Sequence, residues 1–197
     1  MKKTLALTCA FSIISAAAYA EHKPIISIEY ASYDVSQQHI DSPFFGRNNR
    51  DNLVTFGYGY NFDFEQTFFR PGIYYSANDV SIPDTDGSGD KSIYNPQFSV
   101  EADFGVKLND KFDIFFTAGY AQVNFIREVS NRSTEISQWG LAYGFGTQYN
   151  INQNFLISAK YQKWQHEYDT LNNDNTPNPN QYKIHADIIR IGLAYKF

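Results

Sequence analysis

The sequence predicts an all-β fold, an eight-stranded antiparallel transmembrane β-barrel. Three observations predict it: apolar and polar residues alternate along several segments, the links between these segments alternate between long and short, and aromatic residues make up 17% of the chain. A barrel strand alternates in this way because one face contacts lipid and the other lines the interior. A negative mean hydropathy therefore argues only against membrane-spanning helices.

The first twenty residues predict a secretory signal peptide. Lys2 and Lys3 precede an apolar run over residues 4–15, and Ala18-Tyr19-Ala20 has the small-x-small pattern of a cleavage site. The apolar run is too short to cross a bilayer. We therefore expect a cleaved signal over residues 1–20 and one barrel domain over residues 21–197.

Removal of this signal changes the composition. Cys9, the single cysteine, leaves with it, so disulfide bonds cannot hold the mature chain together. Without Lys2 and Lys3, 14 basic and 21 acidic residues remain, a net charge of −7. Such an acidic balance argues against nucleic acid as a partner.

Eight segments show the alternation that is typical of strands. It is clearest over residues 94–108, where every even position is apolar or proline and every odd position is polar, charged or glycine. Two registers stay open: residues 118–125, where Val123 and Phe125 favour the face opposite to Ala118 and Tyr120, and residues 184–188. A β-bulge could reconcile the first. In chain order, the predicted strands cover residues 25–35, 54–62, 68–77, 94–108, 112–125, 139–149, 155–165 and 189–197.

The links between these strands decide between two architectures. Four long links alternate with three short ones, over residues 36–51, 63–67, 78–93, 109–111, 126–137, 150–154 and 166–183. A transmembrane barrel of the outer-membrane type has short periplasmic turns and longer extracellular loops. A β-sandwich could show the same alternation along its strands, but it has no reason to place every long loop at one end. We therefore expect a barrel with both termini in the periplasm and four loops outside.

The end of the chain carries a separate signal. Phe197 is the last residue, and it continues the alternation of the strand before it. The segments 139–149 and 191–197 resemble small eight-stranded outer-membrane barrels, the OmpX/Ail-type and opacity-type surface proteins of the outer-membrane β-barrel domain family. The resemblance implies a location in the bacterial outer membrane and a final strand that the barrel insertion machinery recognises, through Ile191, Leu193, Tyr195 and Phe197.

Seven charged residues are predicted to face the barrel interior. Three are acidic and four are basic, so they could neutralise one another, as buried charges require. Because an eight-stranded barrel is just wide enough for its side chains to fill it, we expect a structural plug rather than a gated ion path. These residues are Glu29, Arg70, Glu101, Asp103, Lys107, Lys160 and Arg190.

The long links would carry any specific function, since binding residues concentrate in loops. In the first link, two phenylalanines beside two arginines could contact lipopolysaccharide phosphates or a protein partner; an ordinary solvated loop is the simpler alternative. These are Phe44, Phe45, Arg47 and Arg50. Asp84, Asp86 and Ser88 have the spacing of a calcium loop, but its twelfth position is Asn95, so we expect an acidic hairpin and no metal site.

Catalytic chemistry is not expected. The candidates are His39, His166 with Glu167, and His185 with Asp187, but no nucleophile motif or metal-ligand spacing accompanies them. His166 and Glu167 are adjacent, so on a strand they should point to opposite faces. We expect no enzyme activity and no cofactor.

The predicted function is therefore a surface scaffold whose loops mediate adhesion or other contacts with a host or with the envelope. The alternative is a narrow pore for small solutes or ions. The expected partners are outer-membrane lipid, lipopolysaccharide, the insertion machinery and a surface ligand of the loops, and the chain is expected to be a monomer.

Overall fold

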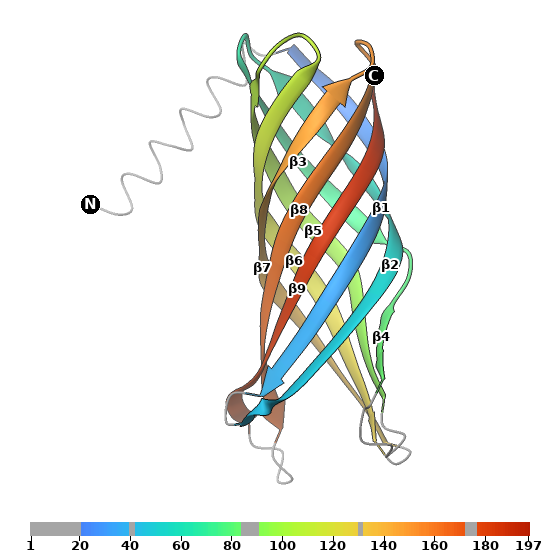
Figure 1. The fold of residues 1–197 in the computed structure, drawn as a ribbon, viewed down its shortest axis with the longest axis vertical. Coiled ribbons are helices and arrows are strands. Elements are labelled where there is room, and N and C mark those ends of the chain that lie inside the picture. Colours follow the sequence, from blue (N-terminus) through green and yellow to red (C-terminus); the bar gives the residue numbers. More distant parts are fainter. Residues whose placement is uncertain (1–20, 40–41, 84–90, 130–131, 172–176) are drawn as a thin grey trace, which may run out of the picture.

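A computed structural model describes residues 21–39, 42–83, 91–129, 132–171 and 177–197 (Figure 1). The predicted signal peptide and the acidic stretch 84–90 lie outside these ranges. The described residues form the strands β1 (Glu21–His39), β2 (Ser42–Asp63), β3 (Thr67–Ser76), β4 (Val80–Pro83), β5 (Lys91–Lys107), β6 (Phe112–Val129), β7 (Arg132–Asn150), β8 (Phe155–Leu171) and β9 (Pro177–Lys196). No helix within the described ranges is long and apolar enough to cross a membrane.

The strands close into a barrel. All pairs are antiparallel, and β1 pairs with both β2 and β9, which joins the first strand to the last. Strands β3 and β4 share one position in the wall because both pair with β5, while β3 also pairs with β2. The predicted fold, a closed antiparallel barrel of eight strands, is therefore confirmed.

Short turns connect the strands at one end of the barrel, at the top of Figure 1, close to the C-terminus. The turns after β5 and β7 have the same construction. The Oδ1 atom of Asn109 accepts the backbone N–H groups of residues 111 and 112, and that of Asn152 accepts those of residues 154 and 155. Asparagine suits such turns because its side chain can replace a backbone acceptor.

The other end, which we call the hairpin end, differs from the sequence-based prediction. The strands continue through much of the four long links: β1 reaches His39 and β2 begins at Ser42, for example, where a loop over residues 36–51 was expected. The long hairpins are therefore built largely of paired strand, with connecting residues at their tips that lie outside the described ranges.

The outer surface of the barrel is apolar over the half next to the short turns. In β1, Ile26, Ile28 and Tyr30 face outward and are 45–55% exposed. Large apolar residues on the other strands continue this band around the barrel, including Phe56, Tyr58, Ile73, Val100, Phe104, Ile114, Phe116, Leu141, Phe145, Ile157, Ile189, Ile191 and Leu193. Exposed apolar side chains on every strand except β4 fit a lipid environment, and we call this band the lipid belt.

Toward the hairpin end, both faces of the wall change polarity. On β1 the outward positions become Ser32 and Asp34, while Tyr33 and Val35 are fully buried inside. The interior of this half is an apolar cluster of Ala31, Tyr33, Val35, Leu53, Val80, Tyr94, Ala121, Val123, Phe125, Ala142, Trp164, Ile184, Ala186 and Ile188. Outward positions there carry ion pairs, such as Lys163 with Asp187 at 3.2 Å. This half is therefore built for water on its outside.

This change of polarity along the strands explains the two registers that the sequence left open, over residues 118–125 and 184–188. Strand β6 needs no bulge, because Val123 and Phe125 face the same interior as Phe115. The register shift lies instead in β5, between Pro96 and Phe98. A bulge exchanges the faces that the side chains before and after it occupy, so Tyr94, which lies before this bulge, is fully buried. The alternation over residues 94–108 groups Tyr94 with the outward apolar face, and this expectation was wrong.

Residues 184–188 also keep a regular alternation. Ile184 and Ile188 are buried, and His185 and Asp187 lie outward between them. The apparent conflict with Ile189 arose because the apolar face of β9 changes from outside to inside between Ile188 and Ile189. No bulge is required on this strand.

The lipid belt predicts a position-dependent cost for an outward arginine. Leu193→Arg lies near the middle of the belt on β9 and should destabilise the barrel by about 2–4 kcal/mol, whereas Ser32→Arg at its edge should cost about 0–1 kcal/mol. Urea-dependent folding into lipid vesicles measures both. Equal costs at the two positions would contradict the assignment of the belt.

Candidate functional site

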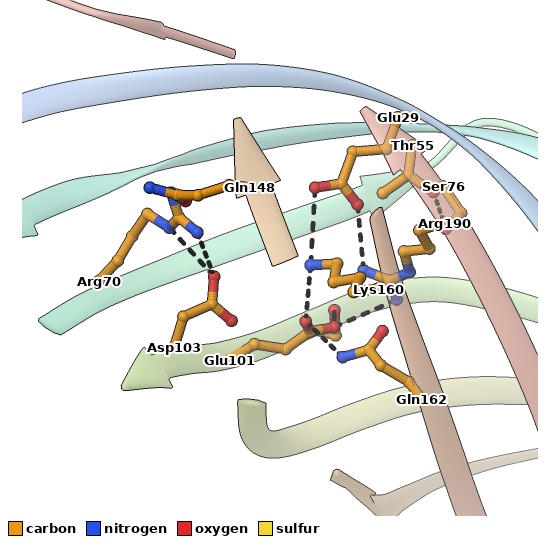
Figure 2. Close-up of polar contacts among 11 residues, drawn as sticks. Glu29, Thr55, Arg70, Ser76, Glu101, Asp103, Gln148, Lys160, Gln162 and Arg190 are labelled. Atoms are coloured by element: carbon orange, nitrogen blue, oxygen red, sulfur yellow. Dashed lines mark hydrogen bonds and ion pairs between the residues drawn. The ribbon is translucent and has the colours of Figure 1, made fainter. Parts of the chain in front are cut away.

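A cluster of four charged residues lies inside the lipid belt (Figure 2). The Lys160 ammonium lies 3.5 Å from Glu29 and 3.3 Å from Glu101. The Arg190 guanidinium lies 3.2 Å from Glu101 and 3.5 Å from Glu29. Each acid therefore contacts both bases. All four side chains are buried. We call these residues the central cluster; its formal charges cancel.

Neighbouring polar and aromatic groups complete the central cluster. Glu101 also accepts hydrogen bonds from the Ser99 hydroxyl at 2.7 Å and from the Gln162 amide at 2.8 Å. The Lys160 ammonium lies 4.3 Å from the centre of the Tyr74 ring, within the range of a cation–π contact. These contacts replace part of the hydration that the charges lose in the interior.

A second cluster lies nearer the short turns. Arg70 donates from Nε and Nη2 to the same Asp103 oxygen, at 3.0 and 2.9 Å, and from Nη1 to Gln148 at 2.9 Å. The Gln148 amide in turn donates to Asp113 at 2.6 Å. The Arg70 guanidinium carbon lies 5.2 Å from the centre of the Phe68 ring. This chain of contacts joins β3, β5, β6 and β7 across the interior.

The structure brings six of the seven predicted interior residues into these two clusters. The exception is Lys107, which is half-buried at the short-turn end, where its ammonium lies 3.1 Å from Asp63 and donates to the Phe64 carbonyl. A cavity between the clusters is lined in part by Glu29, Arg70 and Asp103. The interior thus combines a charged region at the level of the lipid belt with an apolar region beyond it.

The residues proposed to bind a partner in the first long link lie on β2 rather than in a loop. The structure places Phe44, Phe45 and Arg47 within this strand, but their side chains lie outside what it describes. Arg50 is exposed, and its guanidinium lies 3.2 Å from the Asp34 carboxylate on β1. Arg50 therefore already has an anionic partner on the neighbouring strand.

His166 and Glu167 point to opposite faces of β8, as the alternation predicted. His166 is buried, whereas Glu167 beside it is exposed and lies 3.0 Å from Lys183. Asp187, the acid considered with His185, contacts the Tyr161 hydroxyl and the Lys163 ammonium on β8. The His39 side chain is outside the described part. Within the described residues, no group of three or more histidine, cysteine, aspartate or glutamate side chains could hold a metal ion.

The four residues of the proposed insertion signal share the outward face of the last strand. Ile191, Leu193 and Phe197 are 44–57% exposed, and the Tyr195 ring lies 4.9 Å from that of Phe197. The Phe197 backbone N–H donates to the Pro24 carbonyl on β1 at 3.0 Å. The last residue is therefore fixed against the first strand, where the barrel closes.

Several interior residues were not predicted. Gln162 and Tyr74 face inward by the same alternation that placed Lys160 and Arg70, but they were not singled out as part of the network. Asp113 lies on the strand of open register. Alternation could have found all three, but it could not show that Tyr74 lies beneath Lys160, because that contact crosses the barrel.

The model of one protein family, described as the outer membrane protein beta-barrel domain, matches residues 4–197. The chain belongs to this family. It is an outer-membrane β-barrel of the Ail-like type, as the resemblance of its strands predicted.

Two curated relatives support this membership. The attachment invasion locus protein of Yersinia pseudotuberculosis is 31% identical over 173 residues, which cover 82% of this chain and 87% of the relative. The attachment invasion locus protein of Yersinia enterocolitica is 28% identical over 173 residues, covering 82% and 89%. The similarity therefore extends along nearly the whole barrel.

Solved structures show the same fold. Ail, the attachment invasion locus protein of Yersinia pestis, was crystallised in complex with the heparin analogue sucrose octasulfate; it is 20% identical, with a TM-score of 0.58 over 90% of this chain and 99% of that one. Neisserial surface protein A is 9% identical, with a TM-score of 0.52 over 87% and 97%.

The Arg70–Asp103 pair should be strongly coupled. Removing one partner, in Arg70→Met or Asp103→Leu, leaves a buried charge and should destabilise the barrel by about 3–5 kcal/mol. The double variant should cost clearly less than the sum of the two. A double-mutant cycle from urea-dependent folding in lipid vesicles measures the coupling, and additive costs would contradict it.

The filled interior should not conduct steadily. Purified protein in planar bilayers should show no stable large conductance, because the two clusters and the apolar region occupy the lumen in series. Glu101→Lys serves as the matched test, since it would change ion flux only if ions pass the central cluster. A stable open channel that this substitution alters would favour the pore alternative.

Proposed function

We propose that this protein is a non-enzymatic attachment protein of the bacterial outer membrane. The observation that carries the proposal is the reversal of polarity along the barrel. A wall that is apolar outside next to the short turns and polar outside beyond them suits a barrel that crosses the lipid and then projects into water. The four long hairpins stand on the projecting half.

The orientation follows from the lengths of the connections. Barrels of the outer membrane have short periplasmic turns and longer external segments. We therefore place the short turns and both ends of the mature chain in the periplasm, after cleavage of the signal over residues 1–20. The outward side chains of Ile191, Leu193, Tyr195 and Phe197 are then available to the insertion machinery before the strand is surrounded by lipid.

The relatives indicate the kind of partner. Two are named for attachment and invasion, and the Yersinia pestis protein binds a heparin analogue, a densely sulfated sugar. We infer that the hairpins of this chain bind a sulfated glycan or a protein surface that carries one, and that Phe44, Phe45 and Arg47 on the first hairpin contribute. Arg50 would exchange its contact with Asp34 for the sulfate group. Lipopolysaccharide around the monomer is the expected envelope partner.

Truncation of hairpins tests this function. The register shows where each hairpin can be shortened. Removing residues 38–46 links Gln37 directly to its partner Arg47, and removing residues 169–181 links Tyr168 directly to its partner Tyr182. In each case the two linked residues form the new two-residue turn. In lipid nanodiscs on a heparin-coated surface, the combined variant should lose binding because it lacks the first and fourth hairpin tips. Heat-modifiable migration on gels should persist.

A matched control removes residues 127–134 of the third hairpin, which joins the paired Ile126 and Glu135. This variant should keep most of its binding. If binding survives loss of the first and fourth tips, or if the intact protein does not bind heparin above the level of empty nanodiscs, the proposed function is wrong.

A further inference from the structure

The barrel wall is not continuous beyond the lipid belt. Backbone pairing between β7 and β8 ends at Leu141 and Gln165, although β7 continues to Arg132 paired with β6, and β8 continues to Leu171 paired with β9. Pairing between β2 and β3 ends at Thr55, although β2 continues paired with β1. Two seams therefore divide the projecting half.

The seams separate two lobes, which diverge at the bottom of Figure 1. One lobe consists of the ends of β8, β9, β1 and β2, and the other of β4 and the ends of β5, β6 and β7. They face each other across the apolar cluster, to which the first contributes Tyr33 and Ile188 and the second Val123 and Phe125. Beyond the membrane the barrel thus becomes two packed sheets, as in a β-sandwich.

One side chain crosses the first seam at the point where pairing ends. His166 follows Gln165 on β8, and its Nε2 atom lies 3.1 Å from the Ala121 carbonyl on β6, beyond β7. Since a carbonyl only accepts, Nε2 carries the proton in this contact. Its ring also packs edge-on against Tyr94 of β5, at 6.1 Å between centres.

Gly140 of β7 makes this crossing possible. A Cβ atom at this position would lie 2.4 and 2.6 Å from two atoms of the His166 ring and 2.3 Å from the Gln165 carbonyl oxygen. Any larger residue would therefore displace the His166 imidazole, the Gln165 backbone or both. The absence of a side chain at Gly140 leaves the space through which His166 makes its contact between the lobes.

A second side chain crosses the other seam. The Asn49 amide on β2 donates to the Ser81 carbonyl on β4. Asn49 and His166 both lie on edge strands of the first lobe; Asn49 reaches the facing edge strand β4, whereas His166 reaches past β7 to β6. Each seam is thus bridged by a side chain that donates to a backbone carbonyl.

We propose that His166 and Asn49 are positioning residues that fix the two lobes relative to each other, and thereby set the spacing of the hairpin tips that bind the partner. This inference rests on the proposed attachment function. Apolar packing alone tolerates sliding of one sheet over the other. A hydrogen bond to a fixed carbonyl is directional and selects one arrangement.

The experiment measures the spacing of the lobes and binding in the same variants. Spin labels are placed on cysteines at Ser137 of β7 and His185 of β9, outward positions on the two sides of the first seam, in a chain that carries Cys9→Ser. His166→Gln keeps a donor of similar reach, His166→Leu removes it at similar volume, and Gly140→Ala displaces the ring. Ile184→Val, which trims the same apolar cluster, is the control.

In nanodiscs, the spin-labelled chain without further substitution and its His166→Gln and Ile184→Val variants should each give a single narrow distance distribution. His166→Leu and Gly140→Ala should broaden it and shift it to longer distances. Without spin labels, the last two variants should bind the heparin surface roughly two- to tenfold more weakly, the range that the net loss of one hydrogen bond supports. Asn49→Leu should have the same effect on binding.

Unchanged distances in His166→Leu, measured in protein that still shows heat-modifiable migration, would overturn the proposal. Wider spacing with unchanged binding would also overturn it, because the lobes would then not position the tips. Failure of the attachment function itself is recognised separately, by hairpin truncations that leave binding intact in the chain with His166 and Asn49 in place.

Discussion

All strands of this barrel except β3 and β4 pass from the lipid belt into the projecting half, and both faces of each have to change polarity at the same level. The rest of the structure follows from this constraint. In the lipid belt most bulky apolar residues lie outside, so the interior receives small, polar and charged side chains together with the rings of Phe68, Tyr74 and Phe115, which pack against Arg70 and Lys160. Beyond the belt the polar residues lie outside, so the interior can be an ordinary apolar core. Tyr30 and Tyr33, three residues apart on β1, illustrate the change.

The same constraint explains the charged interior. A narrow barrel in lipid cannot fill its lumen with the residues that cover its outside, and it has no disulfide among its described residues to hold it. Opposite charges on strands far apart in the sequence supply cross-barrel contacts instead. Arg190 of β9 and Glu101 of β5, for example, lie on strands that are not neighbours in the wall, yet their charged groups are 3.2 Å apart. Such contacts are costly to leave incomplete, so the closed barrel is favoured over partly assembled forms.

The sequence predicted the strands in the lipid belt well because alternation there has one consistent sense. It placed Glu29, Arg70, Glu101, Asp103, Lys160 and Arg190 inside for the same reason. It could not follow β9 through Ile188 and Ile189, where the apolar face changes sides, or place Tyr94 beyond the bulge. Nor could it show the contact of His166 with Ala121, since contacts between distant strands depend on closure and register.

The two seams also bear on how such a surface can vary. Because β7 and β8 share no backbone pairs between Leu141 and the hairpin end, a hairpin of one lobe can lengthen or shorten without changing the register of the other. Additions in matched pairs of residues keep the inward and outward faces in place. The half within the lipid belt is then a constant base, while the length and sequence of the projecting hairpins can change more freely.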